Sequence, residues 1–208
     1  MGLGRFSFAG LFTCLLFVIS PVALLGSSTT IDFEGLSDGA LVTTQYSGLT
    51  FSNAQILTAG VSLNELEFPP HSGVNVVSDY SGPIAIVFAT PVSSVSGYFT
   101  YSAALTLTAY NSSATVLGSI ASAFTSNDAL SGDPGSSPNE LLQLSFSSGI
   151  SELVIAGDPN GGSFALDDLT YSTGGVTTPE PGTFGFAVCF SLCVLAWKVN
   201  SQARRNRS

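Results

Sequence analysis

The spacing of turn residues constrains the fold of residues 28–178 more than any other feature. Gly, Ser, Asn and Pro recur every eight to twelve residues, between short runs rich in Val, Ile, Thr, Phe and Tyr. In the run 104–110, ALTLTAY, apolar and polar residues alternate as in a strand with one buried face. Lys and Arg, which are good helix formers, are absent from this region. The pattern predicts an all-β domain, a two-sheet β-sandwich with jelly-roll-like order.

Ten further runs have the composition of strands. They are residues 30–33, 49–52, 55–58, 74–78, 84–88, 92–101, 116–121, 141–146, 152–156 and 164–171. The run 84–88, IAIVF, is almost continuously apolar, which is typical of a strand in the centre of a sandwich. Residues 126–139 and 158–162 are predicted loops because they are rich in Gly, Pro, Asp and Asn. We expect one domain, residues 28–173, followed by a short linker, residues 174–178.

The charges are divided sharply along the chain. All five basic residues, Arg5, Lys198, Arg204, Arg205 and Arg207, lie outside residues 28–178, whereas thirteen of the fourteen acidic residues lie inside that range. The domain alone would therefore carry a charge of about −13. Nucleic-acid binding requires Lys or Arg to neutralise phosphates, so the composition excludes it. The three cysteines also lie outside the domain, which excludes a disulfide there.

The N-terminus has the layout of a secretory signal peptide. Arg5 is the only charged residue before Asp32, and the apolar stretch from Phe6 ends in small residues at Gly26, Ser27 and Ser28. We expect residues 1–27 to be this signal, with cleavage near residues 26–28. An uncleaved anchor is the alternative, because Leu24 and Leu25 occupy positions where a cleavage site prefers small residues.

The last thirty residues predict a membrane-inserted tail. Pro179 and Pro181 prevent a helix or central strand from continuing out of the domain. Residues 182–197 then form a run of sixteen uncharged residues, which as a helix would span roughly 24 Å, slightly less than the bilayer hydrocarbon of about 30 Å. The basic residues that follow favour the cytoplasmic side. We therefore expect a single transmembrane helix with the domain on the other side of the membrane.

This tail resembles the PEP-CTERM sorting signal of Gram-negative bacteria. The resemblance covers residues 179–208 and rests on Pro179, Glu180 and Pro181, the apolar run, and the terminal arginines Arg204, Arg205 and Arg207. It implies that an exosortase, a membrane-embedded protease, recognises and removes the tail after the secretion machinery has exported the chain. It also implies a final location at the cell surface or outside the cell, in organisms that often make exopolysaccharide.

Signatures of catalysis are sparse. His71 is the only histidine, in the sequence PPHSG, and no Gly-x-Ser-x-Gly nucleophile motif occurs. A hydrolase built on two carboxylates remains an alternative, although no pair is singled out by the sequence. Tyr98 and Tyr101 are an odd number of residues apart and should face opposite sides of a strand, which weakens the case for an aromatic sugar-binding platform. We therefore expect a protein that is not an enzyme.

Acidic residues lie near both ends of the domain. Asp32 and Glu34 belong to the first predicted strand, and Asp167 and Asp168 to the last. Sandwich domains of the galactose-binding and carbohydrate-binding kind, which this arrangement resembles, often hold a structural calcium ion near such a junction. Calcium requires six to eight oxygen ligands, and the pair Glu34 and Asp168 is our prediction. Adjacent Asp167 and Asp168 should point to opposite faces. The alternative is that these charges protect a strand edge.

These observations predict an exported, non-enzymatic protein of the cell surface or extracellular matrix. Its partners would be the exosortase, the secretion machinery and, before processing, the membrane. A carbohydrate-binding module for exopolysaccharide is the first alternative, and a secreted hydrolase is the second. No cofactor is expected beyond the hypothetical calcium ion.

Overall fold

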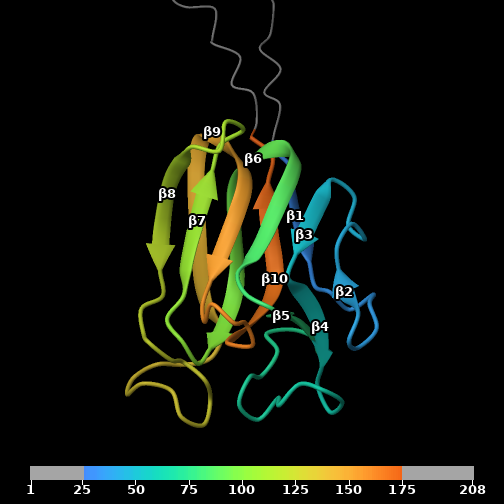
Figure 1. Ribbon diagram of the computed structural model, residues 1–208, viewed down its shortest axis with the longest axis vertical. Coiled ribbons are helices and arrows are strands. Elements are labelled where there is room, and N and C mark those ends of the chain that lie inside the picture. The colour runs from blue at the N-terminus through green and yellow to red at the C-terminus, as the bar shows by residue number, and fades with distance from the viewer. Residues whose placement is uncertain (1–25, 175–208) are drawn as a thin grey trace, which may run out of the picture. The chain divides into compact units, whose positions relative to one another are not determined.

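The computed structural model describes residues 26–174, which form one compact all-β unit (Figure 1). Ten strands occur in this part of the chain, and all their pairings are antiparallel. They are β1 (Ser28–Ile31), β2 (Leu41–Val42), β3 (Leu49–Ser52), β4 (Ala54–Thr58), β5 (Asn75–Asp79), β6 (Ile84–Tyr101), β7 (Thr106–Tyr110), β8 (Val116–Ala121), β9 (Glu140–Ala156) and β10 (Phe164–Ser172). The predicted all-β class is confirmed. No helix in residues 26–174 is long and apolar enough to cross a membrane. Residues 1–25 of the predicted signal peptide and the whole predicted C-terminal helix lie outside the described residues.

The strands are joined by hydrogen bonds into one continuous sheet, in the order β2-β4-β5-β10-β6-β9-β7-β8. Strand β1 pairs with β10 and β3 pairs with β6. The long strands β6 and β9 belong to two layers. Their segments 84–87 and 152–155 pair in the layer that contains β3, β7 and β8, whereas segments 94–99 and 140–145 pair in the layer that contains β10. The expected pair of separate sheets is therefore a single folded sheet; the jelly-roll-like order stays a prediction.

Each of these long strands was expected as two. The sequence predicts breaks between residues 88 and 92 and between 146 and 152, but the chain remains extended through both. Pro91 lies where the ladder between β6 and β9 changes register. Proline is tolerated at such a position, because no hydrogen bond of the ladder requires its missing N–H. Gly149 has φ +85°, and a Cβ added there would lie 2.9 Å from Pro91 Cβ. The bend between the layers thus depends on Pro91 and Gly149, the residue types that predict the end of a strand when the sequence is considered alone.

One hydrophobic core fills the space between the layers. Leu107 and Leu153 contribute to it from one layer, and Phe99 and Leu166 from the other, each with 1% or less exposed. This alternation of buried side chains is what the run 104–110 predicted. A smaller cluster lies on the outer face of the second layer, where Leu63, Val76 and Ala165 are buried together. Residues 59–74 cover this outer face.

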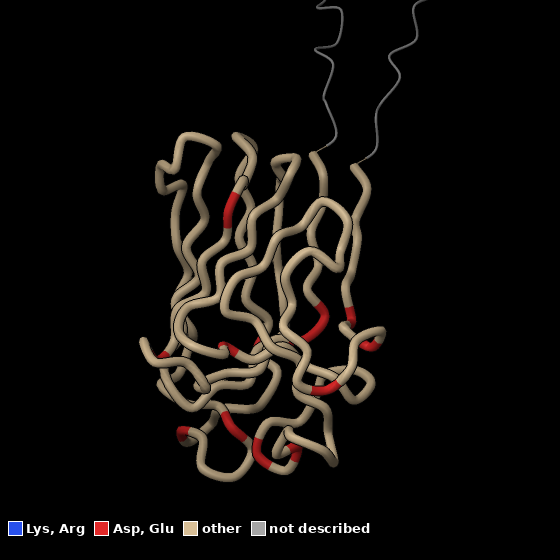
Figure 2. The backbone as a smooth tube through the Cα atoms, turned by 45° about the vertical axis from the view of Figure 1, so that its right-hand side comes forward, with Lys and Arg blue, Asp and Glu red and all other residues tan. Residues whose placement is uncertain are grey.

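The described chain begins and ends side by side. Ser28 pairs with Ser172, and the Thr173 N–H donates to the Ser27 carbonyl at 3.0 Å. The loops 59–74 and 122–139 lie at the opposite end of the unit (Figure 1) and contact each other through a hydrogen bond from Ala129 N–H to the Glu67 carbonyl. We call this end the distal end. Figure 2 shows that most acidic residues lie in the distal half.

Candidate functional site

The candidate site is the place where three carboxylates hold the segment His71–Asn75 against the outer face of the sheet. Asp167 and Asp168 come from β10, and Glu34 comes from the loop after β1. We call these three side chains the carboxylate clamp.

A β-bulge in β10 directs two adjacent carboxylates toward the same segment. The register between β10 and β6 shifts between Asp167 and Thr170, and Asp168 has φ +48°. Asp167 Oδ2 accepts a hydrogen bond from Ser72 N–H at 2.8 Å, and Asp168 Oδ1 accepts one from Ser72 Oγ at 2.9 Å. The expectation that these neighbours face opposite sides was wrong, because a bulge interrupts the alternation of a regular strand.

Glu34 holds the other end of the same segment. Its Oε1 accepts hydrogen bonds from the backbone N–H groups of Val74 and Asn75, both at 2.8 Å. Asn75, which is 3% exposed, donates in turn to the carbonyls of Phe33 at 3.1 Å and Leu36 at 2.8 Å. Glu34 lies beyond the end of β1 rather than within a strand. The structure therefore brings Glu34 and Asp168 to adjoining parts of one loop.

The local electrostatics single out Asp167. Its side chain is almost fully buried, and this desolvation raises the pKa of its carboxyl to about 6. Hydrogen bonds from Ser72 and Asp168 N–H lower this pKa, and the neighbouring charge of Asp168 raises it, but burial dominates. Asp167 consequently changes its protonation state close to neutral pH.

His71 is stacked on Tyr98. Their ring centroids are 3.5 Å apart with an interplanar angle of 8°, and His71 Nδ1 lies 2.6 Å from Asp168 Oδ2. The imidazole therefore covers one face of the Tyr98 ring. Tyr101 points the other way, into the core, where its hydroxyl donates to Glu140. The expectation that Tyr98 and Tyr101 face opposite sides is confirmed.

His71, Ser72 and Asp168 are the residue types of a hydrolytic triad, but they are not arranged as one. In a triad the serine hydroxyl donates to the imidazole, which donates to the carboxylate. Here the Ser72 hydroxyl donates directly to Asp168. The geometry is that of a hydrogen-bonded loop anchor.

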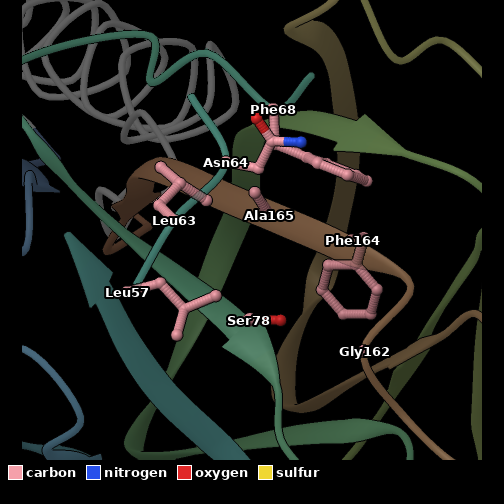
Figure 3. Close-up of a pocket in the computed structure, with 8 residues that line it drawn as sticks. All are labelled: Leu57, Leu63, Asn64, Phe68, Ser78, Gly162, Phe164 and Ala165. Carbon is pink, nitrogen blue, oxygen red and sulfur yellow. The ribbon is translucent and has the colours of Figure 1, made fainter. Parts of the chain in front are cut away.

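A small pocket lies between the loop 59–74 and the sheet (Figure 3). Its volume is about 180 Å³, and the side chains of Leu63, Asn64 and Phe68 from the loop face those of Leu57 and Ala165 from the sheet. This volume is smaller than the 300 Å³ or more that is usual for a small-molecule site. The pocket is therefore a gap in the packing beneath the loop.

The predicted calcium pair has few free oxygen atoms. Both oxygens of Asp168 and one oxygen of Glu34 accept hydrogen bonds from the segment His71–Asn75. No group of three or more His, Cys, Asp or Glu side chains in residues 26–174 is placed to hold a metal ion. A calcium ion at Glu34 and Asp168 would require these hydrogen bonds to be exchanged for metal ligands, so the donor set fits the ion poorly.

Sequence reasoning missed a second set of buried polar groups, which fix the distal loops. Asp79, 1% exposed, accepts hydrogen bonds from Ser163 N–H at 2.9 Å and Phe164 N–H at 3.1 Å, and burial raises the pKa of its carboxyl. Asn127 is fully buried and bonds to the backbone of Tyr101 and Phe99. Their only signal in the sequence is an Asp or Asn at the border of a strand or loop.

The residues of the predicted sorting signal lie outside the described residues: Pro179, Glu180, Pro181, Arg204, Arg205 and Arg207. No protein-family model matches this sequence. No curated protein matches it either.

Solved structures similar to this chain are β-domains. The K2 cleaved adhesin domain of Lys-gingipain is 16% identical, with a TM-score of 0.45, over 70% of this chain and 99% of that one. A family 29 carbohydrate-binding module is 12% identical, with a TM-score of 0.40, over 72% and 93%. A DUF4465 family protein from Bacteroides caccae is 10% identical, with a TM-score of 0.43, over 70% and 98%. With TM-scores below 0.5, these likenesses carry no functional argument.

Proposed function

We propose that this protein is an exported, non-enzymatic β-domain that is displayed at the cell surface or in the extracellular matrix. A signal peptide in residues 1–27 would direct export. The tail, residues 179–208, would hold the chain in the inner membrane until an exosortase removes it. A second candidate function is the binding of polysaccharide outside the cell.

The observation that carries this proposal is the division of charge along the chain. Every Lys and Arg lies in a terminal segment, and the domain between those segments carries thirteen acidic residues and no cysteine. A basic tail after an uncharged run is what an inner-membrane segment requires. A domain without thiols needs no particular redox compartment.

The arrangement of the domain is compatible with display. Because β1 and β10 pair, the chain enters and leaves the domain at one end. A tether at residue 174 would therefore leave the loops 59–74 and 122–139 at the end farthest from it (Figure 1). The clamp carboxylates are engaged in holding one of these loops, which supports a binding or structural role over a catalytic one.

The test is tail processing of the full chain in a Gram-negative host that has an exosortase and in the matched strain that lacks it. We expect mass spectrometry to find a C-terminus shortened near residue 179 only in the first strain. The double variant Pro179→Ala, Pro181→Ala should remain unprocessed in the inner membrane. Thr178→Ala, next to the motif, is the matched control and should be processed normally. Identical products in both strains would refute the sorting proposal.

Polysaccharide binding is a second candidate because of one exposed aromatic side chain. Tyr80 is 57% exposed and lines an open surface depression, which a sugar chain would contact without being enclosed. The depression is also lined by Thr43, Ser52, Asn53 and Ser81. An exposed aromatic ring next to hydroxyl and amide groups is suited to the apolar face and the hydroxyls of a sugar.

Affinity electrophoresis in gels that contain exopolysaccharide from the producing cell tests this second function. We expect the full chain to be retarded and Tyr80→Ala to lose the retardation. Tyr110→Ala, a tyrosine substitution on β7, should behave as the native chain does. Equal mobility of the native chain with and without polysaccharide would exclude this candidate.

The calcium site at Glu34 and Asp168 stays a prediction. Because calcium would have to displace the hydrogen bonds of the clamp, a bound ion should change the melting temperature. Calorimetry with calcium and with a chelator measures that change, and magnesium is the control ion. An unchanged melting temperature in all three conditions would exclude the site.

A further inference from the structure

Strand β8 leaves one edge of the sheet open. It has six residues, VLGSIA, and within residues 26–174 it pairs with β7 alone, at the end of the strand order. The other short edge strands, β1, β2 and β3, have four, two and four residues. An open edge presents backbone N–H and C=O groups that can pair with another strand.

The hydrogen-bond pattern identifies the groups at this edge. Just beyond the ends of β7 and β8, Ser122 N–H donates to the Leu105 carbonyl at 3.0 Å. In an antiparallel ladder, every second residue bonds to the same neighbour. Ile120 and Gly118 therefore bond toward β7, whereas the backbone groups of Ser119 and Ala121 are directed to the open edge. The side chains of Ser119 and Ala121 are also exposed.

The edge has a β-bulge near its start, where the register between β7 and β8 shifts from Ala109–Gly118 to Tyr110–Val116, but its regular part, from Gly118 onward, lacks the side chains that normally prevent strand addition. Edge strands are usually protected by Lys, Pro or inward-pointing charges, and β8 has none of them. The absence extends well beyond β8. Residues 80–127, which include β6, β7 and β8, contain no charged side chain. In a domain with a charge of about −13, such a long uncharged stretch is an exception.

Two copies could pair at the edge of β8 with little electrostatic repulsion. In the layer of β8, the acidic residue is Glu152, which pairs with Tyr110 of β7 and so lies two strands in from the edge. If two copies paired through β8, five strand spacings of about 4.8 Å, or roughly 24 Å, would separate their Glu152 residues. This distance exceeds the Debye length of about 8 Å at physiological salt. A second copy is therefore the partner whose charge this edge fits.

We propose that two copies of this protein associate through antiparallel pairing of β8 with β8, about a two-fold axis at Ser119. The position of Glu140 favours antiparallel over parallel pairing. Its carboxylate lies close to the end of β8, because it accepts a hydrogen bond from Ala123 N–H, two residues after the strand. Antiparallel pairing places Ala123 of the two copies eight residues apart along the ribbon, roughly 27 Å. Parallel pairing would bring the two Glu140 side chains together. Each β8 is used once, so the dimer is closed and does not extend into a fibre.

Cross-linking of the full chain tests the register. In a background in which Cys14, Cys189 and Cys193 are replaced by Ser, the variant Ser119→Cys carries one thiol, and we expect a short bismaleimide to join two chains at it. The matched control is Thr50→Cys, an exposed position on the edge strand β3, which should remain monomeric. No dimer from Ser119→Cys, equal dimer from both variants, or cross-linking to a different polypeptide would each overturn the proposal.

A charge at the edge tests the energetics. Sedimentation equilibrium of the full chain in density-matched detergent should give a dimer dissociation constant at least tenfold higher for Ser119→Lys than for the native chain. Thr50→Lys should match the native chain. Because both positions are exposed, melting temperatures measured at concentrations well below the dissociation constant of the native dimer should be unchanged, which separates a lost interface from a lost fold. Equal dissociation constants for the native chain and Ser119→Lys would refute the interface, whatever the outcome of the sorting experiment.

Discussion

At the scale of single residues, Asp167 makes stability depend on pH. Its pKa in the native state is about 6, above the ordinary value of 3.8, because the carboxyl is desolvated. The native state therefore holds this proton more tightly than the unfolded state does. The resulting stabilisation is fully present below about pH 4 and is lost as the pH rises through about 6.

Replacing Asp167 by Asn should remove this pH dependence. We predict that the free energy of unfolding of the native chain, relative to that of Asp167→Asn, falls by up to about 3 kcal/mol between pH 3.5 and 7. Urea unfolding at four pH values measures this difference, and taking the difference cancels the other carboxyl groups. A difference that is constant or rises with pH would contradict the assignment.

Asp168 combines an unusual backbone conformation with two side-chain contacts. Its φ of +48° is tolerated by Asp and Asn better than by Ala, and its carboxylate holds His71 and Ser72. We predict that Asp168→Ala lowers the free energy of unfolding by about 2–4 kcal/mol and that Asp168→Asn lowers it by less. Urea unfolding of both variants measures the gap. Equal losses would show that the backbone conformation contributes nothing.

At the scale of elements, Asn75 joins β5 to the loop that carries Glu34. Its side chain satisfies the carbonyls of Phe33 and Leu36 and accepts a hydrogen bond from Thr58 Oγ1 at 2.6 Å. Asn75→Ala would remove these hydrogen bonds and leave the Leu36 carbonyl without its side-chain donor, and we predict a loss of about 2–4 kcal/mol in the free energy of unfolding, measured with urea. Asn160→Ala, at an exposed turn, is the control and should change stability by less than about 0.5 kcal/mol.

The short strands could largely be predicted from the sequence. The joining of two predicted strands into one long, continuous strand, as in β6, could not. Alternation in 104–110 and the apolar run 84–88 reflect burial of side chains, which a local pattern records. The continuity of β6 depends on Pro91 lying opposite Gly149, a contact between residues 58 positions apart. Pro and Gly predict strand ends when only their neighbours in the chain are considered.

The candidate site could be predicted only in part, for a similar reason. The sequence singled out Glu34, Asp167 and Asp168 because acidic residues at both ends of the domain resemble the calcium-binding junction of other sandwich domains. Their common partner, the segment His71–Asn75, is about 40 residues from Glu34 and 95 from Asp167. The bulge that turns Asp168 toward this segment is a tertiary feature, since both strand pairing and the Ser72 hydroxyl stabilise it.

At the scale of the whole molecule, the one-sided charge should make stability depend on salt. Thirteen acidic side chains and no Lys or Arg lie in the domain, so repulsion between them opposes folding. Raising the salt from 10 mM to 150 mM shortens the Debye length from about 30 Å to about 8 Å. We predict that the melting temperature of the domain rises by several degrees. This rise corresponds to a gain on the order of 1 kcal/mol in the free energy of unfolding.

Differential scanning calorimetry in sodium chloride measures this rise, and choline chloride is the control for a specific effect of sodium. Both salts should give the same rise, because screening depends on ionic strength. A melting temperature that is constant or falls with salt would show that the repulsion is already relieved within the native fold.

The pairing of Ser28 with Ser172 has a mechanical consequence. A force that pulls the two ends of the domain apart peels β1 from β10, so the hydrogen bonds break one after another. A force applied between Ser172 and the distal loops instead runs along β10, which is flanked by β6 on one side and by β1 and β5 on the other. Those bonds are then loaded in shear and must break together. The domain should therefore resist traction on its distal loops far better than separation of its ends.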